Sequence, residues 1–162
     1  MLLISQSARI SPLADIEDSV RGTRIVIGDD VFIDSFVRIR PVGGTGDVII
    51  GARCYINSGT VIYSGNGVRL GEGVLIAANC TLAPVNHAYR ERSRTILEQR
   101  FAPDRGGIQI EDDVWLGANS VVLDGAHLRK GCVIGAQCLV AGDVPEYSVN
   151  VGNPLRVLGY RI

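Results

Sequence analysis

A period of six residues runs through most of this chain of 162 residues. From position 110 to position 140 an aliphatic residue stands at every sixth place: Ile110, Leu116, Val122, Leu128, Ile134 and Val140. Three runs upstream have the same spacing: Ile27, Ile33 and Ile39; Ile50, Ile56 and Ile62; Leu70, Ile76 and Leu82. A short fixed period is typical of a solenoid, in which each repeat buries its apolar side against its neighbours.

The length of the repeat predicts the shape of the solenoid. Six residues at about 3.3 Å each make one short strand and a corner, so three repeats close one triangular coil. Successive coils then pair through parallel ladders roughly 4.8 Å apart. The aliphatic residue points inward, and so does the residue four places later, where only a small or β-branched side chain fits. The sequence therefore predicts an all-β parallel β-helix of triangular section, with residues 1–162 as a single domain.

The four cysteines follow the same repeat. Each stands four residues after an inward aliphatic residue, in the small inward place: Cys54, Cys80, Cys132 and Cys138. Cysteine packs well as a small apolar residue, and the chain has no CxxC pair. This regular placement favours core positions, so we expect neither a disulfide framework nor a metal site.

The repeat breaks once, between Leu82 and the run Ile108 to Ile110. The intervening segment, at about 87–107, must leave the prism as an excursion loop, and loops of this length in compact domains are usually functional or disordered. It carries five arginines against three acidic residues, together with Tyr89 and Phe101. Two interpretations follow: a flap that shields the coil or contacts a neighbouring subunit, or a lid over an acceptor site.

His87 stands where the loop departs, and it is one of two histidines in the chain. A histidine at such an edge is a candidate general base, because its ordinary pKa lies near working pH. The alternative is a surface histidine bonded to a backbone carbonyl. His127 occupies the same repeat position one coil later, which predicts a shared outer face, and we expect it to be structural. Trp115, the single tryptophan, falls on an outward position, which indicates a partner surface or a stacked ligand.

Bulk properties exclude several classes of function. A net charge of −1 and a pI near 6.1 give no sign of a nucleic-acid or anionic-membrane surface. The N-terminal segment from Met1 to Gln6 is short and becomes polar too early for a signal peptide. No apolar run approaches the length of a membrane span. We therefore expect a cytoplasmic protein that binds no nucleic acid and does not insert into a membrane.

Four motifs, in this order, resemble the hexapeptide-repeat acyltransferases: Asn86-His87-Ala88-Tyr89, Ile110 to Asn119, Ile134-Gly135-Ala136-Gln137 and Val151-Gly152-Asn153-Pro154. Within that family the chain is most similar to the maltose/galactoside O-acetyltransferase group, and especially to bacterial enzymes that acetylate surface-polysaccharide sugars. The resemblance implies a left-handed parallel β-helix, a homotrimer and an acetyl-CoA site in the groove between neighbouring prisms. It also implies acetyl transfer to a hydroxyl of a sugar or polysaccharide precursor, such as a nucleotide-sugar or a lipid-linked glycan.

The same resemblance implies roles for particular residues. His87 matches the catalytic histidine, which takes the proton of the acceptor hydroxyl as that oxygen attacks the thioester, and Asn86 helps to orient this site. Trp115 matches a tryptophan of the cofactor site. Backbone amides of Gly117 and Ala118 lie near the thioester, where one holds the oxyanion. The remaining cofactor positions are Ala136 beside the pantetheine arm, and Asn153 and Pro154 beside the nucleotide end.

Charged residues complete the predicted site. The phosphates of coenzyme A need cations, for which Arg129, Lys130 and Arg156 are the nearby candidates. In the excursion loop, Tyr89 and Arg90 are the candidates for contact with the acceptor.

Three alternatives remain open on the sequence. The same histidine base can serve an amine, so N-acetylation of an amino sugar or of a nucleotide-linked amino sugar competes with O-acetylation. A γ-type carbonic anhydrase shares the prism but needs three histidines per zinc, and this chain has only two. A non-catalytic scaffold is the third alternative, although it would need neither a histidine at the base of a long loop nor an outward tryptophan.

Overall fold

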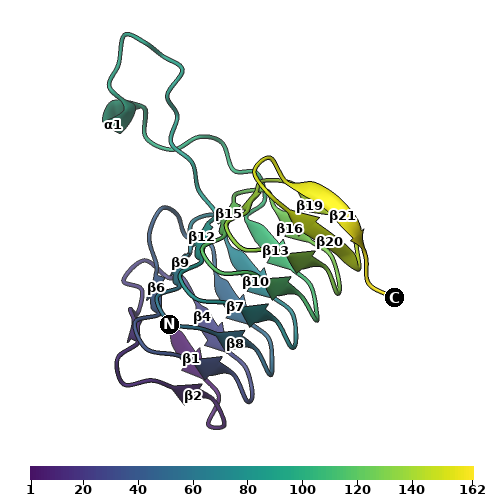
Figure 1. Cartoon of the computed structure of the whole chain (residues 1–162). Coiled ribbons are helices and arrows are strands. Elements are labelled where there is room, and N and C mark those ends of the chain that lie inside the picture. Colours follow the sequence, from purple (N-terminus) through teal and green to yellow (C-terminus); the bar gives the residue numbers. More distant parts are fainter.

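The computed structural model describes residues 1–162 as a triangular prism with one sheet of parallel strands on each side (Figure 1). Sheet A contains β1 (Leu2–Ile4), β4 (Ile25–Ile27), β7 (Val48–Ile50), β10 (Val68–Leu70), β13 (Ile108–Ile110), β16 (His127–Leu128) and β19 (Asp143–Val144). Sheet B contains β2 (Arg9–Ile10), β5 (Phe32–Ile33), β8 (Tyr55–Ile56), β11 (Leu75–Ile76), β14 (Trp115–Leu116), β17 (Val133–Ile134), β20 (Ser148–Val151) and β21 (Arg156–Tyr160). Sheet C contains β3 (Asp15–Ile16), β6 (Arg38–Arg40), β9 (Val61–Tyr63), β12 (Thr81–Ala83), β15 (Val121–Leu123) and β18 (Leu139–Val140). The predicted parallel β-helix is confirmed.

The chain visits the three sheets in the order A, B, C, so each coil has three corners, which we call AB, BC and CA. Neighbouring coils pair in register, and in sheet A the ladder runs from Ile50 to Leu70 to Ile110. One pair breaks the parallel pattern: β21 lies antiparallel to β20 at the C-terminal end of the prism. This strand covers the last coil, which would otherwise present unpaired backbone groups.

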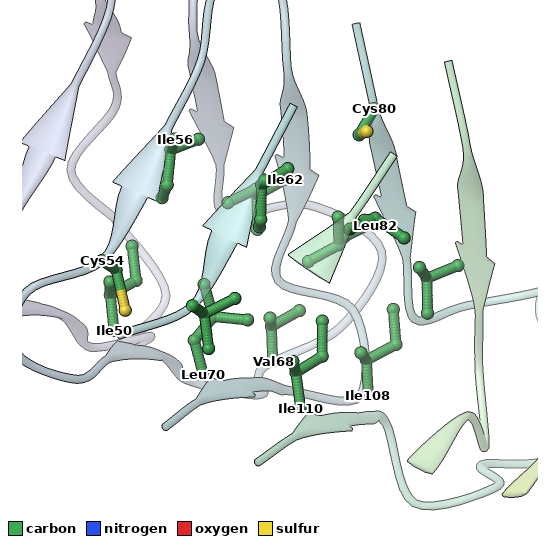
Figure 2. Close-up of a cluster of buried hydrophobic side chains, with 14 of the residues drawn as sticks. Ile50, Cys54, Ile56, Ile62, Val68, Leu70, Cys80, Leu82, Ile108 and Ile110 are labelled. Carbon is green, nitrogen blue, oxygen red and sulfur yellow. The ribbon is translucent and has the colours of Figure 1, made fainter. Parts of the chain in front are cut away.

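The core is a single column of 29 buried apolar residues along the axis of the prism. Figure 2 shows its middle section, where inward side chains from the three sheets meet. Both inward positions of the repeat are buried: the aliphatic ones, such as Leu116 and Val122, and the small ones, such as Ser120 and Ala126. The predicted repeat phase is therefore confirmed.

Glycine follows several of the inward aliphatic residues because the next coil passes very close. A Cβ atom on Gly117 would lie 2.6 Å from the backbone nitrogen of Ala136, and one on Gly51 would overlap the carbonyl oxygen of Gly71. Neither glycine has a left-handed φ, so the restriction comes from the contact between coils and not from the turn itself.

All four cysteines are buried and free, as predicted. Burial raises the pKa of the Cys54 and Cys80 thiols, and it raises that of Cys132 to about 12. We expect all four thiols to resist a maleimide reagent in the native protein, even at pH 8.5, and to react together once the protein is denatured. Rapid labelling of the native protein would contradict their inward placement.

The excursion loop joins β12 to β13 at a CA corner and contains the one helix, α1 (Ile96–Gln99), which the sequence analysis did not predict. Figure 1 shows the loop standing away from the prism, with α1 near its far end. No helix of the protein is long and apolar enough to cross a membrane.

Candidate active site

The base of the excursion loop is a short two-stranded neck. The Ala88 N–H donates to the Arg100 carbonyl at 2.9 Å, and the Ala102 N–H donates to the Asn86 carbonyl at 2.7 Å. Between these bonds His87 and Phe101 form an antiparallel bridge. Beyond the neck, Thr95 and Glu98 form a reciprocal capping box that starts α1. The loop therefore has internal structure of its own, although it leaves the prism.

His87 lies on this neck with its side chain exposed. Its Nδ1 atom is 3.1 Å from the Arg100 carbonyl oxygen, and its ring lies 5.0 Å from the Phe101 ring, measured between centroids. A carbonyl oxygen only accepts hydrogen bonds, so this contact assigns the proton of the neutral imidazole to Nδ1. The Nε2 lone pair has no partner in the chain and is free to accept a proton.

The other predicted residues of the loop lie on the same limb. Asn86 is partly buried and pairs through its backbone with Ala102. Tyr89 and Arg90 stand two and three positions after His87 and are exposed, Tyr89 to 68%. No part of the chain covers them, so these side chains are available to an acceptor or to a second subunit.

Trp115 projects outward from β14 on sheet B and is 49% exposed. It borders a hollow of about 410 Å³ that Leu75, Val133 and Arg161 also line. Sheet B is the side of the prism opposite the CA corner, where the loop carrying His87 departs. One chain therefore does not bring Trp115 and His87 into the same pocket.

Ala118 and Ala136 lie at BC corners, one coil apart. The N–H of Gly117, at the same corner, donates to the Ile134 carbonyl at 2.8 Å and is therefore used within the coil. The N–H groups of Ala118 and Ala136 have no hydrogen-bond partner in the chain, and their side chains are small. Of the two amides predicted to hold an oxyanion, only that of Ala118 is available for this role.

Asn153 and Pro154 lie in the last turn of the chain, before β21. They border a hollow of about 330 Å³ together with Ala141, Gly142 and Leu139. The Ala141-Gly142 turn and the terminal Gly-Asn-Pro motif therefore line the same hollow. Arg156 is exposed at the start of β21, next to this turn.

The other two predicted cations differ in their surroundings. Arg129 binds Asp143 through Nε at 3.0 and 3.1 Å, and this carboxylate, which also borders the hollow beside Asn153, raises the pKa of Arg129. Lys130 lines a separate hollow on sheet A, next to Arg69 and Gln109. The ammonium group of Lys130 forms no ion pair within the chain.

His127 does not share a face with His87, so this prediction was wrong. Regular strand ends at Ala83 and resumes only at Ile108, which takes His87 out of the repeat position that His127 fills on β16. His127 Nε2 lies 2.7 Å from Glu111, and its Nδ1 lies 3.6 Å from Asp143. The Lys130 N–H, with a smaller contribution from His127, holds the pKa of Glu111 below its ordinary value.

No group of three or more histidine, cysteine or acidic side chains is gathered in a way that could hold a metal ion. The predicted residues instead form two sets. His87, Asn86, Tyr89 and Arg90 lie on the loop at one CA corner, whereas Trp115, Ala118 and Ala136 lie on sheet B and at the BC corners. Asn153 and Pro154 border the hollow at the last CA corner, beside Ala141 and Gly142.

Comparison with known proteins agrees with the repeat pattern. Residues 107–142 match the model described as bacterial transferase hexapeptide (six repeats), and residues 47–84 match the hexapeptide repeat of succinyl-transferase. The chain is a hexapeptide-repeat protein. The two matched segments lie on either side of the excursion loop, which belongs to neither repeat set.

Named relatives of this hexapeptide-repeat protein include acetyltransferases. The galactoside O-acetyltransferase of Escherichia coli is 33% identical over 112 residues, which are 69% of this chain and 53% of the relative. An acetyltransferase of Vibrio cholerae, solved with acetyl-CoA, is 25% identical, with a TM-score of 0.63 over 87% of this chain and 70% of its own. The N-acyltransferase AntD of Bacillus cereus shares the fold, with a TM-score of 0.82 at 22% identity over 98% of this chain and 83% of its own. The chain spans about half the length of the curated relatives it matches.

Proposed function

We propose that this protein transfers an acetyl group from acetyl-CoA to a hydroxyl of a sugar or of a polysaccharide precursor, with His87 as the general base. The observation that carries the proposal is the hydrogen bond of His87 Nδ1 to the Arg100 carbonyl, which leaves Nε2 free as a proton acceptor. The O-acetyltransferase relative from Escherichia coli supports a hydroxyl acceptor. The proposal includes a cytoplasmic location, because acetyl-CoA is available there.

The proposed reaction is a direct transfer with no acyl-enzyme. His87 Nε2 takes the proton of the acceptor hydroxyl while the oxygen attacks the thioester carbonyl. The free N–H of Ala118 stabilises the negative charge that develops on the carbonyl oxygen. The C–S bond then breaks, and the leaving thiolate takes the proton from the His87 imidazolium. The histidine returns to its starting form.

The surfaces around the BC corners fit a pantetheine chain, which carries amide groups along a narrow arm. The free N–H group of Ala136 would bind one of its carbonyl oxygens, while that of Ala118 holds the thioester oxygen. The hollow beside Asn153 and Pro154 would take the nucleotide end. Arg156 is the nearest predicted cation to this hollow, and Arg129 borders it through Asp143. Lys130 lies beyond this surface and is the weakest of the three cation candidates.

A site that uses both residue sets must be built between copies of the chain, and we propose the homotrimer that the family resemblance implies. His87 lies at a CA corner and Trp115 on the opposite sheet, so two neighbouring prisms can bring them together. Apolar side chains of the loop support this, because Ile96, Leu97 and Phe101 are 55%, 84% and 49% exposed in their own chain. The acceptor, a sugar, nucleotide-sugar or lipid-linked glycan, would meet Tyr89 and Arg90 in the same groove.

The test of the proposed activity is an acetyl-transfer assay that follows release of the coenzyme A thiol. The acceptors are galactosides, other neutral sugars, nucleotide-sugars and amino sugars. We expect an acetylated sugar whose acetyl group hydroxylamine removes, as it removes esters and not amides. A product that resists hydroxylamine would be an amide, and the acceptor group would then be an amine instead of a hydroxyl. Release of the coenzyme A thiol that no acceptor in the panel increases would contradict the proposal.

Replacing Trp115 by alanine tests the between-copies arrangement. We expect Trp115→Ala to raise the KM for acetyl-CoA about fivefold, since loss of one stacking aromatic costs on the order of 1 kcal/mol. The melting temperature should stay near that of the wild type, because half of the indole is exposed. Trp115→Phe is the matched control and should keep most of the affinity.

Co-expression of Trp115→Ala with His87→Ala then tests whether the two residues act from different copies. In mixed trimers about a quarter of the sites would combine an intact His87 with an intact Trp115. We therefore expect the mixture to be more active at low acetyl-CoA than the average of the two variants alone. Activity equal to that average would contradict a shared site.

A further inference from the structure

The coils on either side of the excursion loop meet through two side chains. Asn66 lies in the CA corner of the coil before the loop, and Asp124 lies in the CA corner of the coil after it. The loop takes the place of the corner between them. The Asn66 Nδ2 group donates to Asp124 Oδ2 at 3.0 Å, so these corners, 58 residues apart in the chain, are in direct contact.

Asp124 holds the returning limb of the loop. Its side chain is 1% exposed and forms no ion pair. Besides Asn66, it accepts hydrogen bonds from the Arg105 N–H at 3.1 Å and from the Gly107 N–H at 2.9 Å. A buried carboxylate is costly unless such donors satisfy it, and bonds to a charged acceptor are stronger than neutral ones. This carboxylate therefore fixes the last residues of the loop against the coil.

Asn66 holds the departing limb as well. Its backbone N–H donates to the Pro84 carbonyl at 2.9 Å. The returning limb packs equally closely, because a Cβ atom on Gly107 would overlap the carbonyl oxygen of Gly67. Asn66 and Asp124 together thus hold both limbs at the base of the loop.

The held limbs lead directly to His87. The residue stands three positions after Pro84 on the departing limb. On the other limb, Ala102 donates to the Asn86 carbonyl, and the Arg100 carbonyl contacts His87 Nδ1. Both limbs are hydrogen-bonded to each other on either side of the imidazole. A shift at the base of the loop therefore displaces the whole neck and with it the Nε2 atom.

We propose that Asn66 and Asp124 form a clamp that positions His87 for acetyl transfer. This inference rests on the proposed function and adds two positioning residues to it, since neither side chain reaches the exposed face of the imidazole. The clamp explains why a buried carboxylate with no ion-pair partner lies beneath a surface loop. A position error of about 1 Å at a reacting group can cost on the order of a hundredfold in rate, so the effect on catalysis is large.

The test compares Asp124→Asn with the wild type. The substitution keeps the shape of the side chain but turns one acceptor oxygen into an NH2 group that faces N–H donors. We expect kcat to fall about 10-fold to 100-fold, with the KM for acetyl-CoA changed less than about twofold, because none of the residues bonded to Asp124 lines the hollow proposed for the cofactor. Asp30→Asn is the matched control, since Asp30 is exposed in an early coil, far from the loop.

Hydrogen exchange gives a readout that does not depend on acetyl transfer. In Asp124→Asn we expect the amides of Ala102, Arg105 and Gly107 to exchange roughly tenfold faster, while those of β11 and β14 stay protected. The His87 ring nitrogens, observed by NMR, should lose the single Nδ1-protonated form. If the wild type transfers no acetyl group, the proposed function fails, and these two measurements still decide whether the clamp exists.

If Asp124→Asn does not fold, Asn66→Ala provides the same test. It removes the hydrogen bond between the two corners and leaves the Asp124 carboxylate in place. It should change exchange and kcat in the same direction by a smaller factor. The double variant Asn66→Asp/Asp124→Asn restores a bond between the corners and should recover part of kcat. Unchanged loop exchange in both single variants, or a fall in kcat that the double variant deepens, would overturn the clamp.

Discussion

Replacing His87 by alanine is expected to lower kcat for acetyl transfer by about 100-fold to 10,000-fold, the range that a positioned general base contributes. The reason is that Nε2 of His87 is a free proton acceptor, whereas both ring nitrogens of His127 face carboxylates. The measurement is steady-state transfer from acetyl-CoA to the best sugar acceptor. Because His87 is exposed, the melting temperature and the subunit number should not change.

His127→Ala is the matched control for this experiment. It removes the other histidine of the chain from a site bordered by Glu111 and Asp143, and it should leave kcat within a few-fold of the wild type. A His87→Ala variant that turns over at a nearly normal rate would contradict the proposed mechanism. So would a His127→Ala variant that is fully inactive while still folded.

Truncating one core residue is expected to have the largest effect on stability. Leu82 on β12 is fully buried, and its neighbours in the ladder are Ile62 and Val122. Leu82→Ala should lower the free energy of unfolding by about 2–5 kcal/mol, because the neighbouring coils are held in register and cannot collapse into the cavity. Chemical denaturation followed by circular dichroism measures the change.

The control for Leu82→Ala is Leu158→Ala, which removes the same atoms from a side chain that is 73% exposed on β21. Its effect should stay within about 0.5 kcal/mol. Equal losses in the two variants would contradict the single buried column of the prism.

The core could be predicted from the sequence because its pattern is local. Each six-residue repeat has one aliphatic and one small inward residue, so the period alone predicted that Cys54 and Cys132 lie inside and that Trp115 lies outside. Glycine also recurs directly after several inward aliphatic residues, and the structure shows the reason. At Gly51 and Gly117 the next coil passes too close for a side chain, and the turn does not require a left-handed conformation.

The loop could be predicted only as an interruption. Helix α1 was missed, although Thr95 and Glu98 have the spacing of a capping box and could have signalled its start. The pairing of His87 with Phe101 and the bonds of Asp124 join residues far apart in the chain. No periodic pattern encodes such contacts, because they depend on which limb of the loop meets which corner.

The arrangement of the candidate site could not be predicted from the repeat either. The period distinguishes inward from outward positions, but it does not show that the Gly117 amide is bonded within the coil while that of Ala118 is free. Nor does it show that His87 and Trp115 lie on opposite sides of one prism. These features support the proposal of a site shared between copies, which the family resemblance implies and the period alone does not.

A calorimetric titration of the purified protein with acetyl-CoA, with His87→Ala alongside, tests the central claim most directly. We expect saturable binding to both proteins at one site per chain, because His87 acts on the acceptor proton and does not hold the cofactor. Absence of binding to either protein at millimolar acetyl-CoA would contradict the acetyltransferase proposal.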